Sequence, residues 1–211
     1  MLALYYFPGP CSLAAHVALE ETGAAYERRT IELRSGEQNR EDYRRINSRA
    51  QVPALDVDGT VITESVAILT FIGGRFPEAR LLPIDLIEQA RCQAFLAWIS
   101  SQVDPVFRRL ARPERIVPDE VARLAVKLAA THAYWAKCRE IDALLGNDLW
   151  VMGTHYTVCD PYALVYYGWV ARIGLPVADL TRYTALEQRL LDRPAVRRVL
   201  ELEKHPLLAT T

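Results

Sequence analysis

The sequence predicts a small mixed α/β domain followed by an all-helical domain. Three observations favour this division. Up to Pro77 the candidate elements are short and alternate between strand and helix patterns, after Pro83 long helical patterns replace them, and the two prolines mark the change. The expected boundaries are residues 1–77 for the first domain, 78–85 for a linker and 86–211 for the second domain. A chain of 211 residues is long enough to bury a sizeable core.

Seven elements are expected in the first domain, in the order strand, helix, strand, helix, strand, strand, helix: residues 2–6, 12–22, 26–33, 41–47, 52–57, 60–63 and 64–76. The turn-forming residues 7–10 (Phe-Pro-Gly-Pro) must end the first strand, and Gly23 ends the first helix. The Asp-Gly pair at 58–59 is a hairpin signal between two strands.

The second domain shows helical patterns alone, over residues 86–110, 118–145, 163–170, 183–191 and 195–203. Pro118 followed by two acidic residues is typical of a helix start. Thr157 and Asp160 form a candidate N-cap pair before the third helix. That helix is apolar on nearly every face, so it should cross the core, with Tyr166 and Trp169 buried in it.

Composition and charge exclude several classes of protein. The sequence has 25 Lys+Arg against 26 Asp+Glu, so it lacks the positive field that gathers nucleic acid. No apolar run approaches the ~18 residues that span a membrane, and the first residues lack the basic leader of a signal peptide. The four cysteines and four histidines are scattered, which argues against a disulfide framework and against a metal site. We expect a cytoplasmic protein that binds no nucleic acid, membrane or metal.

The chemistry should lie where the first strand meets the first helix. Cys11 stands at the expected N-terminus of that helix, where unpaired N–H groups and the helix dipole favour a thiolate and lower the thiol pKa. Ser12 is a natural N-cap residue. The alternative is that Cys11 is only a small buried apolar side chain and Ser12 only a cap.

Two other junctions in the first domain suit a peptide ligand. A cis Val52–Pro53 bond would turn the backbone of Val52 outward to pair with an extended peptide, although most X–Pro bonds are trans. Glu64 and Ser65 open a helix whose N–H groups would hold a carboxylate while Glu64 faces an ammonium group; ordinary first-turn stabilisation is the alternative. A ligand with a thiol, two carboxylates and an amine satisfies all three places, and glutathione is such a ligand.

In this order and spacing, four segments resemble the cytosolic glutathione transferases, most closely the bacterial beta class: residues 5–13 (YYFPGPCSL), 51–55 (QVPAL), 63–68 (TESVAI) and 157–160 (TVCD). The resemblance covers essentially the whole chain. It implies a thioredoxin-like N-terminal α/β domain, an all-α C-terminal domain, a cis peptide bond at Pro53, a homodimer, and glutathione as co-substrate without a metal. It also implies that Thr157 and Asp160 cap a buried helix and serve folding.

Family roles then transfer residue by residue. Cys11 matches the cysteine that contacts the glutathione sulfur and can form a mixed disulfide with it, and Val52 matches the residue whose backbone pairs with the tripeptide. Glu64 and Ser65 match the pair that binds the γ-glutamyl group, and Ser101 lies where a helix of the partner subunit approaches. The implied glutathione-binding residues are Cys11, Gln51, Val52, Pro53, Glu64, Ser65 and Ser101. The implied electrophile pocket is formed by Phe7, Pro10, Asp104, Phe107 and Arg108.

The sequence departs from the beta-class pattern at two places. The loop 34–38 has no lysine where the class usually has one, and Asp104-Pro105 replaces a His-Lys pair. Asp104 cannot act as a cationic partner for a thiolate, and Pro105 should bend its helix. Ser12, or the hydroxyl of Tyr6, is therefore an alternative to Cys11 as the group that hydrogen-bonds to the glutathione sulfur.

The resemblance implies a detoxifying transferase that activates the glutathione thiol for attack on a small electrophile. Two alternatives stay open on the sequence alone. One is a glutathione-dependent thiol–disulfide redox enzyme that uses Cys11 as its nucleophile. The other is a non-catalytic binding protein on the same fold.

Overall fold

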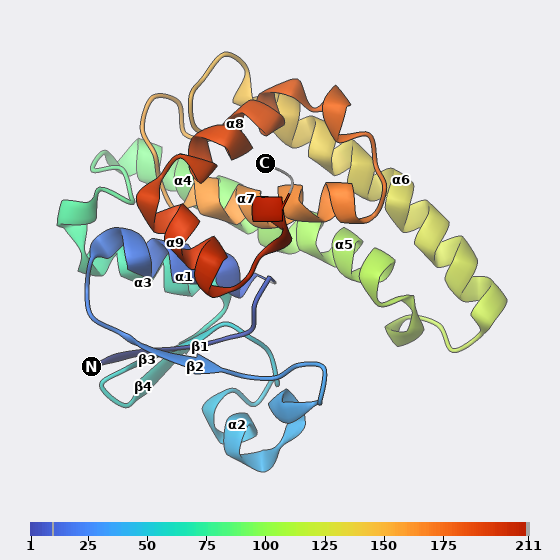
Figure 1. Ribbon diagram of the computed structural model, residues 1–211, viewed down its shortest axis with the longest axis horizontal. Coiled ribbons are helices and arrows are strands. Elements are labelled where there is room, and N and C mark those ends of the chain that lie inside the picture. The colour runs from blue at the N-terminus through green and yellow to red at the C-terminus, as the bar shows by residue number, and fades with distance from the viewer. Residues whose placement is uncertain (10, 210–211) are drawn as a thin grey trace.

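The computed structural model describes residues 1–9 and 11–209 of the chain. Its N-terminal part is built on a four-stranded sheet in the order β2-β1-β3-β4 (Figure 1). The strands are β1 (Leu2–Tyr6), β2 (Glu27–Thr30), β3 (Ala54–Val57) and β4 (Thr60–Thr63). β1 runs parallel to β2 and antiparallel to β3, and β3 and β4 form the predicted hairpin. The crossover between the parallel strands is α1 (Ser12–Thr22).

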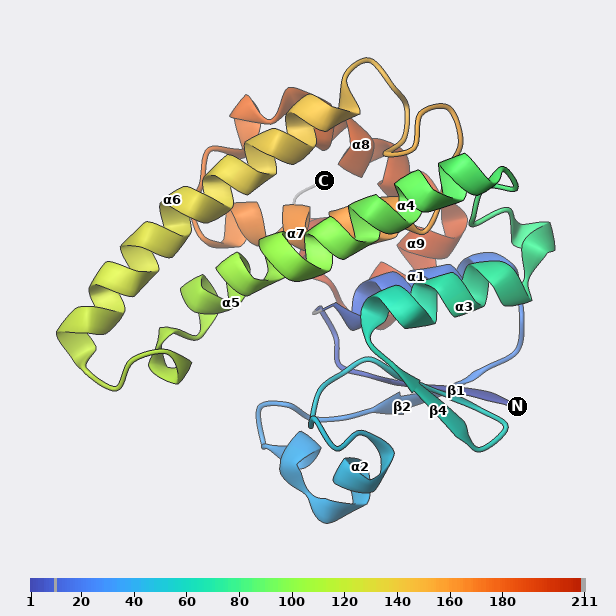
Figure 2. The same cartoon turned by 180° about the vertical axis from the view of Figure 1, so that it is seen from behind.

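The two faces of the sheet are covered differently because successive side chains of a strand point to opposite sides. Leu4, Tyr6 and Leu55 belong to the main core, which α1 and α3 (Ser65–Arg75) share. Tyr5 and Ala54 face the other way, into a small cluster with Ile31 and Tyr43 of α2 (Glu41–Ile46). The helical domain therefore lies on one face of the sheet and α2 on the other (Figures 1 and 2).

The C-terminal part is helical: α4 (Leu86–Trp98), α5 (Asp104–Ala111), α6 (Glu120–Leu145), α7 (Cys159–Arg172), α8 (Thr181–Leu191) and α9 (Pro194–Leu202). In Figure 2, α4 and α5 line up as one long rod beside α6. α7 crosses the core, and Tyr166 is fully buried as predicted. None of the helices in the described part of the chain is long and apolar enough to cross a membrane.

The expected single helix over residues 86–110 is interrupted. A π-helical turn, Ile99–Val103, separates α4 from α5, and the backbone N–H of Asp104 bonds to the carbonyl of Ile99, five residues back. Pro105 has no N–H to give to the carbonyl four residues before it, so a regular α-helix would be broken at this point. The wider turn accommodates the proline, and such turns are frequent at functional sites.

The connection between the two parts packs closely. A 3₁₀ turn, Pro77–Ala79, follows α3, and a Cβ added at Gly73 of α3 would lie 2.5 Å from Cγ of Leu82. Only a glycine permits this approach. Leu81 is buried, and its carbonyl accepts a bond from the N–H of Val158. The division at residues 77 and 85 stays a prediction.

The expected N-cap pair is present at the start of α7. Oδ2 of Asp160 accepts the N–H of Thr157 at 2.7 Å, and Oγ1 of Thr157 accepts the N–H of Cys159 at 3.3 Å. Oδ1 of Asp160 also accepts the N–H of Val151 at 2.8 Å, so this carboxylate ties the preceding loop to the helix. Asp160 is fully buried, and burial raises the pKa of its carboxyl to about 7.

Candidate active site

A cavity of about 260 Å³ lies between the sheet domain and the α4–α5 rod. It is lined by Cys11, Asn47, Gln51, Val52, Pro53, Glu64, Ser65, Val66, Ser100, Arg108 and Tyr162. Every residue predicted to bind glutathione lines it except Ser101, whose neighbour Ser100 does so instead. The structure thus brings together the end of the first loop, the segment before β3 and the start of α3, as the sequence predicts.

The segment before β3 is held in shape by two hydrogen bonds to one carbonyl group. The carbonyl oxygen of Gln51 accepts from Oη of Tyr43 at 2.6 Å and from Nδ2 of Asn47 at 2.7 Å. The Val52–Pro53 peptide bond that follows is cis, as expected. Asn47 also lines the cavity. This role could not be predicted from the sequence, because an Asn at the end of a short helix is ordinary.

The start of α3 adopts an unusual backbone conformation. Glu64, at the N-cap position, has φ 71° and ψ 124°, outside the regions that non-glycine residues favour. Its carboxylate is largely exposed and lies 3.5 Å from the guanidinium of Arg49. A strained residue of this kind persists only where the surrounding structure holds it, and such residues cluster at ligand sites. Glu64 and Ser65 together present a carboxylate and a helix N-terminus to the cavity.

The environment of Cys11 differs from the prediction. Its thiol donates to Oδ1 of Asp104 at 3.5 Å and lies 3.6 Å from the hydroxyl of Tyr166. Tyr166 also donates to Oδ1 of Asp104 at 3.2 Å, while the guanidinium of Arg108 bonds to the other oxygen. Burial, and next the charge of Asp104, raise the pKa of the Cys11 thiol to about 12. The expected lowering of this pKa is therefore wrong, because burial of the thiol is the largest effect and the charge of Asp104 acts in the same direction.

The hydroxyl of Ser12 is fully buried and turned away from the cavity. It donates to the carbonyl of Phe7 at 2.8 Å and accepts the N–H of Phe7 at 3.3 Å, so it closes the loop between β1 and α1. Tyr6 is also buried, with its ring 4.9 Å from that of His16. Neither residue lines the cavity, and both have structural contacts where a catalytic role was considered.

The predicted electrophile pocket is only partly assembled. Arg108 lines the cavity, whereas Asp104 is 8 % exposed and lies behind it. Phe107 packs at 4.7 Å from the ring of Trp169 and at 5.3 Å from that of Tyr134. The guanidinium of Arg34 lies over the ring of Phe7, 5.7 Å from the ring centroid. The prediction for Pro10 lies outside the described residues.

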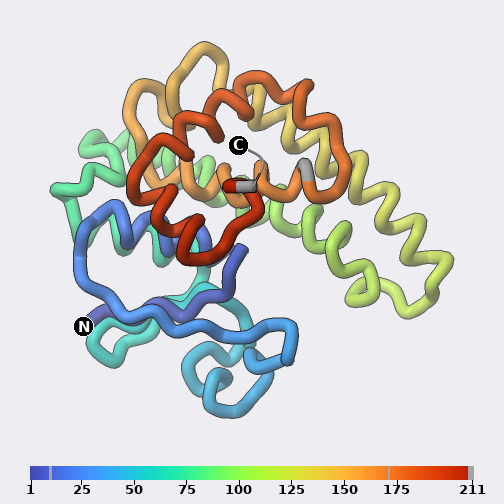
Figure 3. Tube along the Cα trace, in the orientation of Figure 1, coloured from blue at the N-terminus to red at the C-terminus, as the bar shows by residue number. Residues whose placement is uncertain are grey.

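A buried carboxylate, Glu203, holds the loop that precedes Cys11. Glu203, just after α9, accepts the N–H of Gly9 at 2.9 Å through Oε2, and its Oε1 lies 2.6 Å from Nδ1 of His16. Both side chains are fully buried. Figure 3 shows the C-terminal segment passing beside this loop. Nothing in the sequence around Glu203 indicates this contact, because its partners lie almost the whole chain away.

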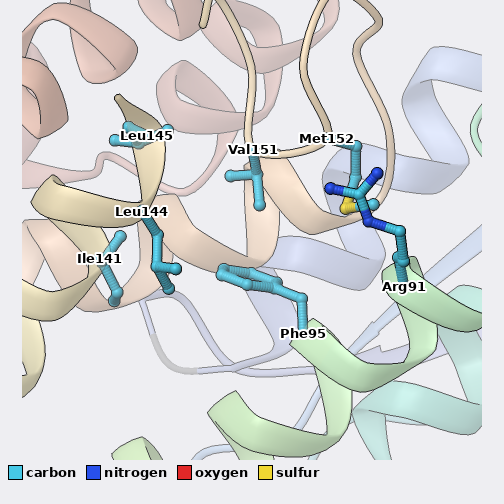
Figure 4. A pocket seen from close by; sticks show the side chains of 7 residues that line it. All are labelled: Arg91, Phe95, Ile141, Leu144, Leu145, Val151 and Met152. Atoms are coloured by element: carbon cyan, nitrogen blue, oxygen red, sulfur yellow. The ribbon is translucent and has the colours of Figure 1, made fainter. Parts of the chain in front are cut away.

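A second cavity of about 190 Å³ lies between α4, α6 and the loop after α6 (Figure 4). Its lining is Arg91, Phe95, Ile141, Leu144, Leu145, Val151 and Met152, and the ring of Phe95 points between α6 and the loop. It shares no residue with the cavity at Cys11, and its lining contains no nucleophile or carboxylate. Within residues 1–9 and 11–209, no group of three or more His, Cys, Asp or Glu side chains is placed to hold a metal ion.

Cysteine accessibility provides a first check of this arrangement. Cys92, Cys138 and Cys159 are fully buried, whereas Cys11 is partly exposed and lines the cavity. We expect slow alkylation of one of the four thiols in the native protein and of all four after denaturation. Intact-mass spectrometry after iodoacetamide treatment, with peptide mapping, measures this. Native modification of Cys92 or Cys159 would contradict the packing of α4 against α7.

Comparison with known proteins agrees with this geometry. Residues 1–74 match the family model described as glutathione S-transferase, N-terminal domain. Over 208 residues the chain is 31% identical to glutathione S-transferase GstA of Escherichia coli O157:H7, covering 96% of this chain and 98% of that protein.

Two solved structures are similar over nearly the whole chain. The bacterial beta class glutathione S-transferase of Sphingomonas chungbukensis is 32% identical with a TM-score of 0.84, covering 95% of this chain and 98% of that one. A sphingomonad glutathione S-transferase complexed with glutathione is 30% identical with a TM-score of 0.85, covering 96% and 98%. Because these relatives are at least 30% identical over nearly the whole chain, the chain belongs to the glutathione S-transferase family.

Proposed function

We propose that the chain binds glutathione in the cavity at Cys11 and joins it through its thiol sulfur to a small electrophile. The observation that carries the proposal is the lining of that cavity, which combines the backbone segment at Val52, the α3 N-terminus at Ser65 and the thiol of Cys11. A glutathione-bound relative that is 30% identical over nearly the full chain supports the same ligand.

Each part of the tripeptide has a complementary group on this chain. The γ-glutamyl carboxylate fits the N–H groups at the start of α3 and the hydroxyl of Ser65, since a helix N-terminus attracts anions. Its ammonium group fits the exposed carboxylate of Glu64. The backbone of Val52 is the natural partner for the cysteinyl amide. These contacts place the glutathione sulfur beside Cys11.

The reaction then needs the glutathione sulfur as a thiolate and an electrophile held close to it. Hydrogen bonds to the sulfur favour its ionised form, and one pKa unit corresponds to ~1.4 kcal/mol of preference. The glutathione thiol loses its proton to solvent, and the thiolate attacks the electrophile with its electron pair. Either a leaving group then departs from the electrophile with its bonding electrons, or an activated double bond of the electrophile takes up the negative charge. Arg108, at the wall of the cavity, faces the space left for the electrophile.

A binding experiment tests the glutathione site. Replacing Ser65 with alanine removes one hydrogen bond to the carboxylate, so we expect the Kd for glutathione to rise about tenfold, since such a bond is worth about 1.5 kcal/mol or more. Calorimetric titration measures this for the wild type, Ser65→Ala and Ser35→Ala, an exposed serine in the loop after β2 that serves as the matched control. Absence of binding by the wild type at millimolar glutathione would overturn the proposal.

We also assign the chain to the beta class, in agreement with the identity to the Sphingomonas chungbukensis enzyme. A homodimer fits this assignment: Ser101 lies in the π-helical turn, exposed and outside its own subunit's cavity, where it can approach the glutathione of a partner subunit. Sedimentation at a series of protein concentrations tests the homodimer. A detoxifying role in the cytoplasm of a bacterium stays a prediction from the resemblance.

A further inference from the structure

A buried carboxylate lies directly behind the thiol that faces glutathione. Oδ1 of Asp104 accepts from the thiol of Cys11 at 3.5 Å and from the hydroxyl of Tyr166 at 3.2 Å, and the guanidinium of Arg108 bonds to Oδ2. Donors from α5, from α7 and from the end of the first loop therefore converge on this one side chain. A carboxylate that receives these three donors is fixed in position, and it accepts a hydrogen bond from the Cys11 thiol, which keeps its proton.

The charged and titratable groups around Cys11 decide which form of its thiol persists. Asp104 and Arg108 face it from α5, and Tyr162 and Tyr166 face it from α7. Arg108 is the only cation among these four, its side chain is half exposed, and it already pairs with Asp104. Burial and the charge of Asp104 disfavour the thiolate, and they outweigh the opposing effects of Tyr166 and Arg108.

We propose that Asp104 is a positioning residue that holds Cys11 as a neutral thiol by accepting its hydrogen bond, so that Cys11 does not act as the nucleophile of a disulfide exchange. The part that concerns glutathione rests on the function proposed above. The part that concerns Cys11 rests on its contact with Asp104 alone.

The two reactions of the site differ in what they demand of Cys11. In a disulfide exchange, the Cys11 thiolate must attack one sulfur of a glutathione disulfide, forming a Cys11–glutathione bond and releasing a glutathione thiolate. A thiol that keeps its proton does not begin this step. In conjugation the new sulfur–carbon bond uses the electron pair of glutathione itself, and the Cys11 proton stays in place. Asp104 therefore selects conjugation over exchange.

The expected consequence of removing the carboxylate is a more reactive Cys11. In Asp104→Asn the thiol loses its charged acceptor while Arg108, released from its ion pair, becomes the nearest full charge and favours the thiolate. We expect the rate of Cys11 alkylation by iodoacetamide at pH 7 to rise at least tenfold, and its pH profile to move to lower pH. We also expect the variant, and not the wild type, to gain the mass of one glutathione when it is incubated with glutathione disulfide.

The measurement is the rate of alkylation against pH, followed by intact-mass spectrometry on the full chain. Asp104→Glu keeps a carboxylate, so its pH profile of alkylation should match that of the wild type. Asp148→Asn, which removes an exposed carboxylate after α6, is the matched control. Cys11→Ala shows that the signal comes from Cys11. A purely structural role for Asp104 would change the melting temperature and leave the pH profile in place.

Two results would overturn the proposal. One is an Asp104→Asn profile within twofold of the wild type at every pH. The other needs no variant: a wild-type profile with its midpoint at or below 9.0, the ordinary thiol pKa, would mean that Asp104 does not hold the proton. Glutathione titration of the same samples separates this outcome from failure of the proposed function, because alkylation of Cys11 does not require that glutathione bind.

Discussion

Replacing Glu203 with alanine is expected to destabilise the protein, by about 1–3 kcal/mol for each buried polar group that loses its hydrogen-bond partner. His16 would lose the carboxylate 2.6 Å from Nδ1, and the N–H of Gly9 would lose its acceptor. The other ring nitrogen of His16, Nε2, is buried and has no hydrogen-bond partner among the described residues, so the ring has no second hydrogen bond. Urea unfolding followed by tryptophan fluorescence, at one protein concentration, measures the loss.

The same substitution should weaken glutathione transfer even where the variant is still folded. Gly9 lies two residues before Cys11, so a loosened loop carries the thiol away from the cavity. A misplacement of about 1 Å costs a transferase as much as 100-fold in rate. Glu201→Ala removes an exposed carboxylate from the same helix end and is the matched control. Equal stability of the two variants would show that the buried pair contributes nothing.

Replacing Asp160 with alanine is expected to have a comparable effect at the start of α7. The N–H of Thr157 would be left buried without an acceptor, at about 1–3 kcal/mol, and the half-buried N–H of Val151 would lose its acceptor as well. Asp119 caps the exposed start of α6 in a similar way, accepting from Ala122, and Asp119→Ala should cost only about 1 kcal/mol. Urea unfolding of the two variants side by side checks the difference, and equal losses would contradict it.

Protonation of Asp160 should make the free energy of unfolding depend on pH in a definite direction. Burial raises the pKa of its carboxyl to about 7 in the folded protein, against 3.8 for an exposed aspartate. The folded state therefore binds the extra proton, and the stability from this group is fully present below about pH 3.8 and is lost as the pH rises to about 7. We expect the free energy of unfolding of the wild type, relative to Asp160→Asn, to fall over this range by on the order of 1 kcal/mol per pKa unit. If the free energy of unfolding of the wild type, relative to Asp160→Asn, rose with pH instead, the prediction would be contradicted.

Features encoded by neighbouring residues could be predicted from the sequence. The end of β1 at residues 7–10, the β3–β4 hairpin at Asp58-Gly59 and the cap at Thr157 and Asp160 each depend on residues only a few positions apart. The glutathione-binding segments were predicted for a different reason: each is a recognisable junction, and the family resemblance implied that they meet. The cavity contains all of them except Ser101.

Features that depend on distant residues could not be predicted in this way. The pKa of Cys11 was expected to fall because the helix N-terminus is visible in the local sequence, whereas Asp104 lies 93 residues away and Tyr166 was expected only to fill the core. The apolar pattern of α7 identified its burial correctly but gave no sign that the hydroxyl of Tyr166 approaches the thiol. The helix is irregular just before Pro105, as the π-helical turn Ile99–Val103, whereas the bend expected at Pro105 stays a prediction.

The bond between Gly9 and Glu203 also affects the order in which the protein can be made. The two residues are 194 positions apart, so the sheet domain leaves the ribosome long before the carboxylate that fixes its loop. During that interval the nascent chain carries the strands and helices of the glutathione cavity but not the anchor of the loop that leads to Cys11. The loop that leads to Cys11 therefore gains this bond only after α9 has emerged.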